Sequence, residues 1–134
     1  MIIPRKGFTL TELLLAVGFL VFALSSSLIL FANCILLNEY NRSLSIAASH
    51  AQYVMEEIKD TNFSSVKTNI DNGNWDWDTS DIAAKGLSSL GGESIDANES
   101  GTSSELLNVT ITVNWQARNG RARSTFLETL IVEP

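Results

Sequence analysis

The stretch Gly7-Phe8-Thr9-Leu10-Thr11-Glu12 decides how this chain is organised, because it joins a short basic leader to a long apolar run. Arg5 and Lys6 precede the glycine, and the run from Leu13 to Leu37 carries no ionisable acid or base apart from the thiol of Cys34. A helix of about 25 residues extends about 37 Å, whereas a bilayer core is about 30 Å thick. The sequence therefore predicts one membrane-spanning helix. Its basic flank predicts a cytoplasmic N-terminus and an extracytoplasmic C-terminal part.

Glu12 is the unusual residue of this stretch. A carboxylate beside hydrocarbon is costly and usually marks function. Cleavage after Gly7 would make Phe8 the first residue, and its ammonium group would then be able to pair with Glu12 of a neighbouring copy. The simpler interpretation is a glutamate at a helix N-terminus, where the helix macrodipole favours negative charge. The sequence leaves both interpretations open.

The segment Lys6–Glu12 with the apolar run behind it resembles the type III signal of type IV prepilins and pseudopilins. In that family a membrane aspartyl peptidase cuts after the glycine and methylates the new N-terminal phenylalanine. The resemblance implies cleavage between Gly7 and Phe8, N-methylation of Phe8 and a role for Glu12 in assembly. It also implies three partners: the prepilin peptidase/methylase, other pilin or pseudopilin subunits, and the bacterial inner membrane. The motif covers about the first quarter of the chain, and the remainder resembles the family in architecture more than in motif.

Two other processing signals are weaker. A secretory signal with its apolar core at Leu13–Phe22 would be cut after Ala23-Leu24-Ser25, but apolar character resumes at Leu28. A lipoprotein signal would use Cys34, which lacks the small residue expected before it.

Size and charge restrict the part outside the membrane to one small acidic domain. The chain has 134 residues and a formal charge of −6. Loss of Arg5 and Lys6 lowers the basic count from nine to seven against fifteen acids, which gives −8. Such acidity argues against binding of nucleic acid or of an anionic membrane by the outer domain. A single cysteine inside the apolar run leaves that domain without a disulfide, unlike many major pilins.

The region 38–60 continues the helix in amphipathic form. Apolar residues recur at alternating three- and four-residue intervals: Leu37, Tyr40, Leu44, Ala47, Ala51, Val54 and Ile58. No proline interrupts Phe8–Asp60, so one helix of about fifty residues is predicted, apolar all round in its first half. His50 stands beside the stripe without a catalytic partner at a suitable spacing, and it is interpreted as structural or exposed.

The region 61–105 is rich in Asn, Ser, Gly and Asp, and it is predicted as an irregular connection with a short helix near Asp81–Leu90. The polar run 96–105 is interpreted as loop, and Trp75 and Trp77 are expected to anchor the connection to the core. Close spacing of carboxylates suggests weak calcium candidates: Asp71, Asp76, Asp78 and Asp81. Their order does not match an EF-hand loop, so a solvated acidic loop is preferred and no metal site is assigned.

The region 106–134 shows strict alternation and predicts a β-hairpin around Asn119-Gly120. A two-residue turn there would set Val113 opposite Phe126, Val109 opposite Leu130 and Leu107 opposite Val132 on a buried face. That register leaves Glu128 opposite Ile111 as a misfit, which a bulge or an edge position would relieve.

These observations predict an α+β fold in pilin-like arrangement: leader 1–7, transmembrane and assembly helix 8–37, and a small extracytoplasmic domain 38–134. That domain is expected to have three or four antiparallel strands, one or two of them within 61–105. No phosphate loop, nucleophile elbow or metal-ligand spacing occurs, so no enzyme activity is expected. The expected function is a structural subunit, a minor pilin or minor pseudopilin, of a type IV pilus or a type II secretion filament. A pilus, protein secretion and DNA uptake remain open as the machine it serves. The alternatives are a single-span anchored binding module or adhesin, and then an exported enzyme with an uncleaved anchor.

Overall fold

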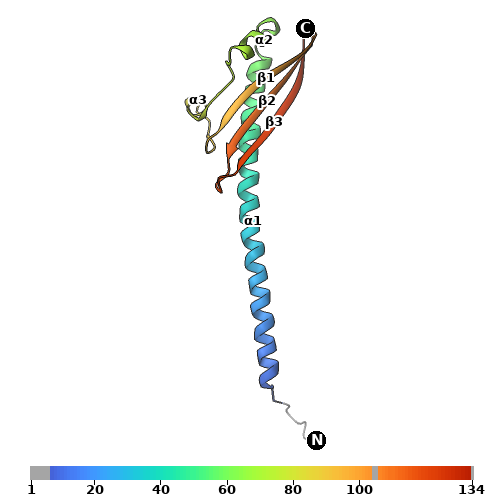
Figure 1. Cartoon of the computed structure of the whole chain (residues 1–134), viewed down its shortest axis with the longest axis vertical. Helices are drawn as coiled ribbons and strands as arrows, with labels where there is room; N and C mark the ends of the chain where they lie inside the picture. Colours follow the sequence, from blue (N-terminus) through green and yellow to red (C-terminus); the bar gives the residue numbers. More distant parts are fainter. Residues whose placement is uncertain (1–6, 104–105, 134) are drawn as a thin grey trace. The chain divides into compact units, whose positions relative to one another are not determined.

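The computed structural model describes residues 7–103 and 106–133, and Figure 1 shows its helices and strands. The elements, in order, are α1 (Leu10–Lys59), α2 (Phe63–Asp71), α3 (Thr79–Ala84), β1 (Ser94–Ser103), β2 (Leu106–Gln116) and β3 (Ala122–Val132). The chain is α+β, as the alternation and helix patterns predict. It divides into two compact units after Glu39, which are described in turn.

The first unit contains the N-terminal part of α1, up to Glu39. Its large apolar side chains are exposed from Phe8 to Leu37. A window of this helix has a mean hydropathy of 2.5 with none of it buried, so the helix is long and apolar enough to cross a membrane. Among the described residues of this unit, no apolar core covers these side chains. Exposure of this kind marks a surface that lipid or other helices cover.

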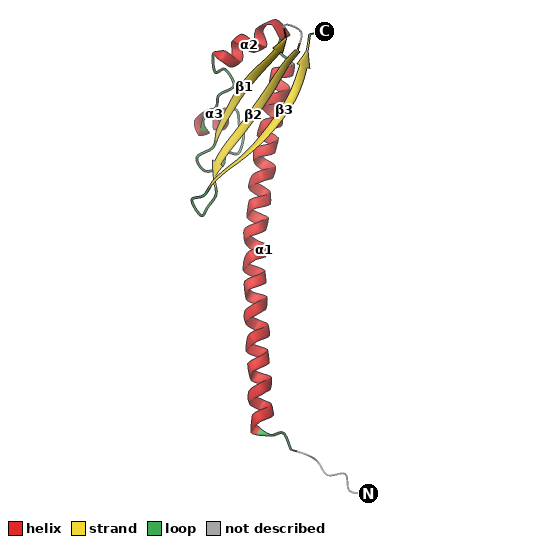
Figure 2. Ribbon diagram, turned by 45° about the vertical axis from the view of Figure 1, so that its right-hand side comes forward, coloured by secondary structure: helices red, strands yellow, loops and turns green. Residues whose placement is uncertain are grey.

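The second unit runs from Tyr40 and packs the C-terminal part of α1 on a three-stranded antiparallel sheet of order β1-β2-β3. Figure 2 shows the three strands beside this part of the helix. The predicted stripe is the buried face of the helix, since Ala47, Ala51, Val54 and Ile58 all belong to the core. β2 supplies the facing layer by strict alternation of buried and half-buried residues. Its buried residues are Leu107, Val109, Ile111, Val113 and Trp115.

The register of the hairpin differs from the predicted one by a single residue. Thr112 lies opposite Phe126, and Asn108 lies opposite Leu130. The connection is a three-residue loop, in which Gly120 N donates to Ala117 O at 2.8 Å and Ala117 N donates to Arg121 O at 2.9 Å. Gly120 takes a positive φ of 77°, as the last residue of such a loop requires. The prediction of a two-residue turn was therefore wrong.

The corrected register changes which face of β3 is covered. Phe126, Leu130 and Val132 are exposed by 69%, 60% and 60%, whereas Leu127 and Ile131 pack partly against the core. Glu128 lies opposite Thr110 on the outward face and not opposite Ile111. The predicted misfit disappears because the one-residue change exchanges the two faces of the strand.

The region 61–105 is more regular than predicted. α2 was not expected, and the short helix is α3, which lies slightly earlier than predicted. β1 is a strand of the kind expected within 61–105, but it occupies most of the polar run that was interpreted as loop. Ile95 and Ala97 of β1 face the core, while Asp96 and Asn98 face outward. Only two apolar residues alternate there, so the strand depends on its pairing with β2 more than on its own propensity.

Candidate functional site

Glu12 closes the N-terminus of α1 in a capping box with Thr9. Glu12 N donates to Thr9 Oγ1 at 3.3 Å, and Thr9 N donates to Glu12 Oε2 at 3.0 Å. Thr9 Oγ1 also donates to Oε2 at 2.8 Å. A Thr-x-x-Glu pair satisfies two orphan amide groups reciprocally, which explains why the helix begins at Leu10. The helix-terminal interpretation of Glu12 is therefore realised within the chain.

This cap occupies only one oxygen of the carboxylate. Both bonds from Thr9 end on Oε2, and no bond to Oε1 is found among the described residues. A carboxylate accepts hydrogen bonds on both oxygens. Oε1 is thus available to a cation from outside the chain without breaking the cap.

Gly7 and Phe8 lie immediately before the helix, outside any regular element. Phe8 is 77% exposed, and nothing lies within 4 Å of the position that a Cβ on Gly7 would take. Both residues that flank the predicted cleavage site are therefore exposed. Arg5 and Lys6 of the predicted leader lie outside the described residues.

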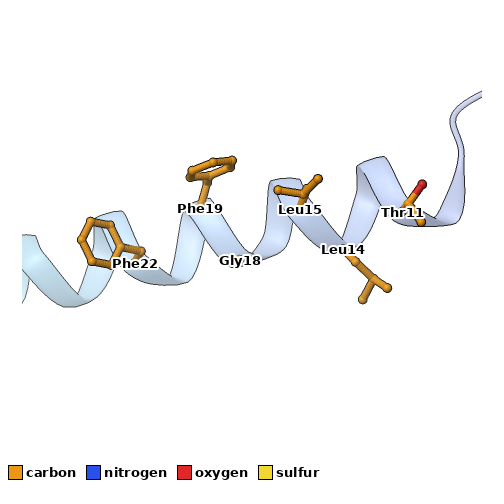
Figure 3. Close-up of a pocket in the computed structure, with 6 residues that line it drawn as sticks. All are labelled: Thr11, Leu14, Leu15, Gly18, Phe19 and Phe22. Carbon is orange, nitrogen blue, oxygen red and sulfur yellow. The ribbon is translucent and has the colours of Figure 1, made fainter.

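An open groove follows along the same helix, with a volume of about 720 Å³. Six residues line it: Thr11, Leu14, Leu15, Gly18, Phe19 and Phe22. Figure 3 shows bare ribbon at Gly18 between the side chains of Leu15 and Phe19. No atom outside the local helix backbone lies within 4 Å of the Cβ position there. A glycine flanked by large apolar residues lets a second helix approach closely.

Two serines of the apolar run are satisfied inside the helix. Ser25 Oγ donates to Val21 O at 2.8 Å, and Ser26 Oγ donates to Phe22 O at 2.9 Å. A hydroxyl bonded to the carbonyl four residues earlier adds no unsatisfied polar group to an apolar surrounding. These serines are therefore compatible with a membrane-spanning helix.

The four aspartates named as weak calcium candidates have other roles or stay apart. Asp76 Oδ1 accepts from Ala97 N at 3.0 Å, while Asp78 and Asp81 form the capping box of α3. Bonds from the Ser80 hydroxyl and from the amides of Asp81 and Ser80 lower the pKa of Asp78. Asp71 ends α2. Within residues 7–103 and 106–133, no group of three or more His, Cys, Asp or Glu is placed to hold a metal ion.

His50 is structural, as one of the two sequence interpretations predicts. It is 4% exposed, and its Nδ1 lies 2.7 Å from Oε1 of Glu93, which is also buried. The sequence did not indicate this partner, because 43 positions separate the two residues. A lone acid directly after Gly91-Gly92, in a stretch otherwise interpreted as loop, was the only available signal.

The two tryptophans of the connection anchor it to the core, as expected. Trp75 and Trp77 are both buried, and Trp77 forms an isolated bridge with Ile95 of β1. Lys85 closes the outer side of Trp77, with its Nζ 4.0 Å from the ring centroid and 2.8 Å from Glu57 Oε1. These contacts are structural, and no reacting group converges on them among the residues described.

Comparison with known proteins identifies no relative of this chain. No protein-family model matches it, and no curated protein or solved structure matches it either.

Proposed function

We propose that this chain is a structural subunit of a bacterial filament, a minor pilin or minor pseudopilin that waits in the inner membrane and is drawn into a helical assembly. A pilus, a type II secretion filament and a DNA-uptake filament all fit this proposal. Small size and the lack of a disulfide in the outer domain favour a minor subunit over the main building block.

The observation that carries the proposal is the placement of Glu12 at the head of an exposed apolar helix. Its Oε2 caps the helix through Thr9, which leaves Oε1 for a charge from another chain. Cleavage after Gly7 would create such a charge on Phe8. In surroundings of low dielectric constant, pairing an acid with an ammonium recovers much of the cost of burying either one.

Packing supplies the remaining drive for assembly. Lipid chains are as apolar as the side chains of another helix, so the hydrophobic effect does not favour helix–helix contacts over helix–lipid contacts. An apolar helix therefore leaves lipid only when close packing with other helices replaces its contacts with lipid chains. The groove at Gly18 lets the backbone of a second helix come close, and Phe19 and Phe22 provide large contact area beside it.

Intact-mass analysis of the protein from cells that carry a prepilin peptidase tests the proposal. The expected mass lacks residues 1–7 and carries one additional methyl group. Cells without the peptidase are the control, and they should give the full-length mass. Full-length protein in both strains would contradict the proposal.

The competing function is a single-span anchored module that binds a partner and does not assemble. The exposed apolar row of Phe126, Leu130 and Val132 on the outward face of β3 favours it, because such a row suits a protein partner. An unprocessed N-terminus together with recovery as an isolated subunit would support this alternative.

A further inference from the structure

The hairpin that joins β2 to β3 carries a concentration of positive charge in an acidic domain. Arg118, Arg121 and Arg123 lie within six residues, and all three are exposed. We call these three residues the basic tip. The part of the chain after Leu37 has seven basic and fourteen acidic residues, so the basic tip holds almost half of its positive charge.

One arginine of the basic tip contacts a residue that follows the apolar run closely in sequence. The guanidinium carbon of Arg123 is 5.1 Å from the ring centroid of Tyr40. Tyr40 follows Leu37 by three residues in the same helix, which is about 4.5 Å along the axis. Contact with Tyr40 therefore fixes Arg123 close to the membrane exit of the chain.

The length of the helix places Tyr40 at a definite depth. The 28 residues from Glu12 to Tyr40 rise about 42 Å along α1. A bilayer with its headgroup layers is about 40–45 Å thick. When Glu12 lies in the inner headgroup layer, Tyr40 lies in the outer one. Tyrosine is enriched at this level of membrane proteins.

We propose that the basic tip binds the phosphates of anionic phospholipids in the outer leaflet of the membrane that the chain spans. This contact holds the domain against the membrane surface while the subunit waits for assembly. The proposal rests on the membrane anchor of the proposed function and adds a lipid-binding surface to it. Guanidinium groups suit phosphate because they donate in a planar fork.

The net charge of the domain opposes this contact, but its distribution favours it. Glu128 lies five residues beyond Arg123 on β3, about 16 Å away along the strand. That distance exceeds the Debye length of about 8 Å at physiological ionic strength, so its repulsion from lipid is largely screened. Asp96 is a second acidic residue, and it lies nearer to this end of the sheet than Glu128 does. Its Oδ2 accepts a hydrogen bond from Asn114 Nδ2 at 3.0 Å.

The exposed Arg42 adds a further positive charge two residues after Tyr40. Glu39 lies at the same level with negative charge, and Glu39 and Arg118 each already have an interaction partner. The proposal therefore depends on Arg121 and Arg123 most of all.

Fluorescence quenching in vesicles tests the proposal with the full chain. One probe is a fluorophore on the native Cys34, which reports insertion through quenchers on lipid acyl chains. The other is a fluorophore at Ala122→Cys in a Cys34→Ser background, which reports docking through quenchers on lipid headgroups.

Vesicles contain either phosphatidylcholine alone or phosphatidylcholine with phosphatidylglycerol. The variants are Arg121→Gln and Arg123→Gln, singly and together, with Lys59→Gln as the control of equal charge change at the other end of α1.

We expect headgroup quenching at position 122 to be stronger in phosphatidylglycerol vesicles and to fall to the neutral level in 1 M salt. Each arginine replaced by glutamine should weaken docking about fivefold, whereas Lys59→Gln should change it less than twofold. Arg123→Lys keeps the charge but loses the planar fork, so it should weaken docking less than Arg123→Gln does. Quenching of Cys34 with no effect of phosphatidylglycerol at position 122 would overturn this inference alone. Failure to quench Cys34 would remove the membrane anchor as well. Headgroup quenching that depends on protein density at fixed lipid composition would assign the basic tip to a neighbouring copy and also overturn the proposal.

Discussion

His50 on α1 and Glu93 before β1 share a buried bond of 2.7 Å between Nδ1 and Oε1. The second oxygen, Oε2, accepts from Leu90 N at 2.7 Å, and the backbone carbonyl of Glu93 accepts from Thr79 Oγ1 at 3.1 Å. One glutamate thus joins the helix, the start of α3 and the turn before the sheet. All of these residues belong to the unit that begins at Tyr40.

Removal of one partner of this pair should destabilise the domain strongly. Glu93→Ala leaves His50 buried without its acceptor, and His50→Ala leaves a buried carboxylate, so each should lower the free energy of unfolding by about 3 kcal/mol. Replacement of both by apolar residues of similar size, His50→Leu with Glu93→Met, should cost less than either single change. Urea denaturation of the full chain in detergent measures the difference. Single variants as stable as the wild type would show that the pair is not a structural link.

Trp115 is buried, but its indole Nε1 has no acceptor among the described residues. Trp115→Phe therefore removes an unsatisfied donor, and we expect the free energy of unfolding to change by less than about 1 kcal/mol. Trp115→Ala should instead cost about 3–5 kcal/mol, because it leaves a large cavity. Thermal unfolding of the two variants provides the comparison. Equal losses in both would indicate that the indole N–H has a partner.

The cap of α3 should respond to acid. Hydrogen bonds from the Ser80 hydroxyl and from the amides of Asp81 and Ser80 lower the pKa of Asp78 in the folded state. Its contribution to stability is therefore present above the ordinary aspartate pKa and is lost as the pH falls through the lowered value. NMR titration of the Ser80 and Asp81 amides should report that lowered pKa, and Asp78→Ala should abolish the transition. An ordinary pKa for Asp78 would contradict the capping geometry.

Gly18 should matter for assembly and not for the stability of its own helix. Gly18→Leu fills the groove while raising helix propensity, so we expect normal membrane insertion and processing but at least tenfold less protein in filaments. Gly18→Ala is the matched control, since alanine raises propensity and remains small. Quantitative blotting of sheared filaments and membranes measures both. Full incorporation of Gly18→Leu would place the helix–helix contact elsewhere.

The sequence predicts the helices and strands that have a strong hydrophobic period. α1 and the two long strands are recognisable because their apolar residues repeat at helical or strand spacing over ten residues or more. The Thr9–Glu12 capping box is also visible as a local pattern in the sequence. Only the structure shows that Thr9 bonds to one carboxylate oxygen of Glu12 and leaves the other one without a bond among the described residues. Structural features that depend on residues close together in the sequence can therefore be predicted from the sequence.

The parts that sequence alone did not predict depend on distant partners. β1 contains few apolar residues and becomes a strand by pairing with β2. The hairpin register depends on whether its loop has two or three residues, and Asn119-Gly120 fits both. Glu93 contacts His50, and Tyr40 contacts Arg123. The two residues of each pair are distant in the sequence, so the sequence alone does not reveal these roles.

Incorporation of Glu12 variants into filaments tests whether Glu12 pairs with the N-terminal ammonium group of a neighbouring subunit. Cells should express the wild type, Glu12→Gln or Glu12→Asp beside the sister subunits of the same machine, and the measurement is the fraction of processed protein that co-purifies with sheared filaments. Glu12→Gln keeps an acceptor for the Thr9 cap but loses the charge, so we expect normal cleavage after Gly7 and a large loss from filaments, with Glu12→Asp retaining part of the incorporation. Incorporation of Glu12→Gln at the wild-type level would contradict the pairing of Glu12 with a neighbouring N-terminal ammonium group.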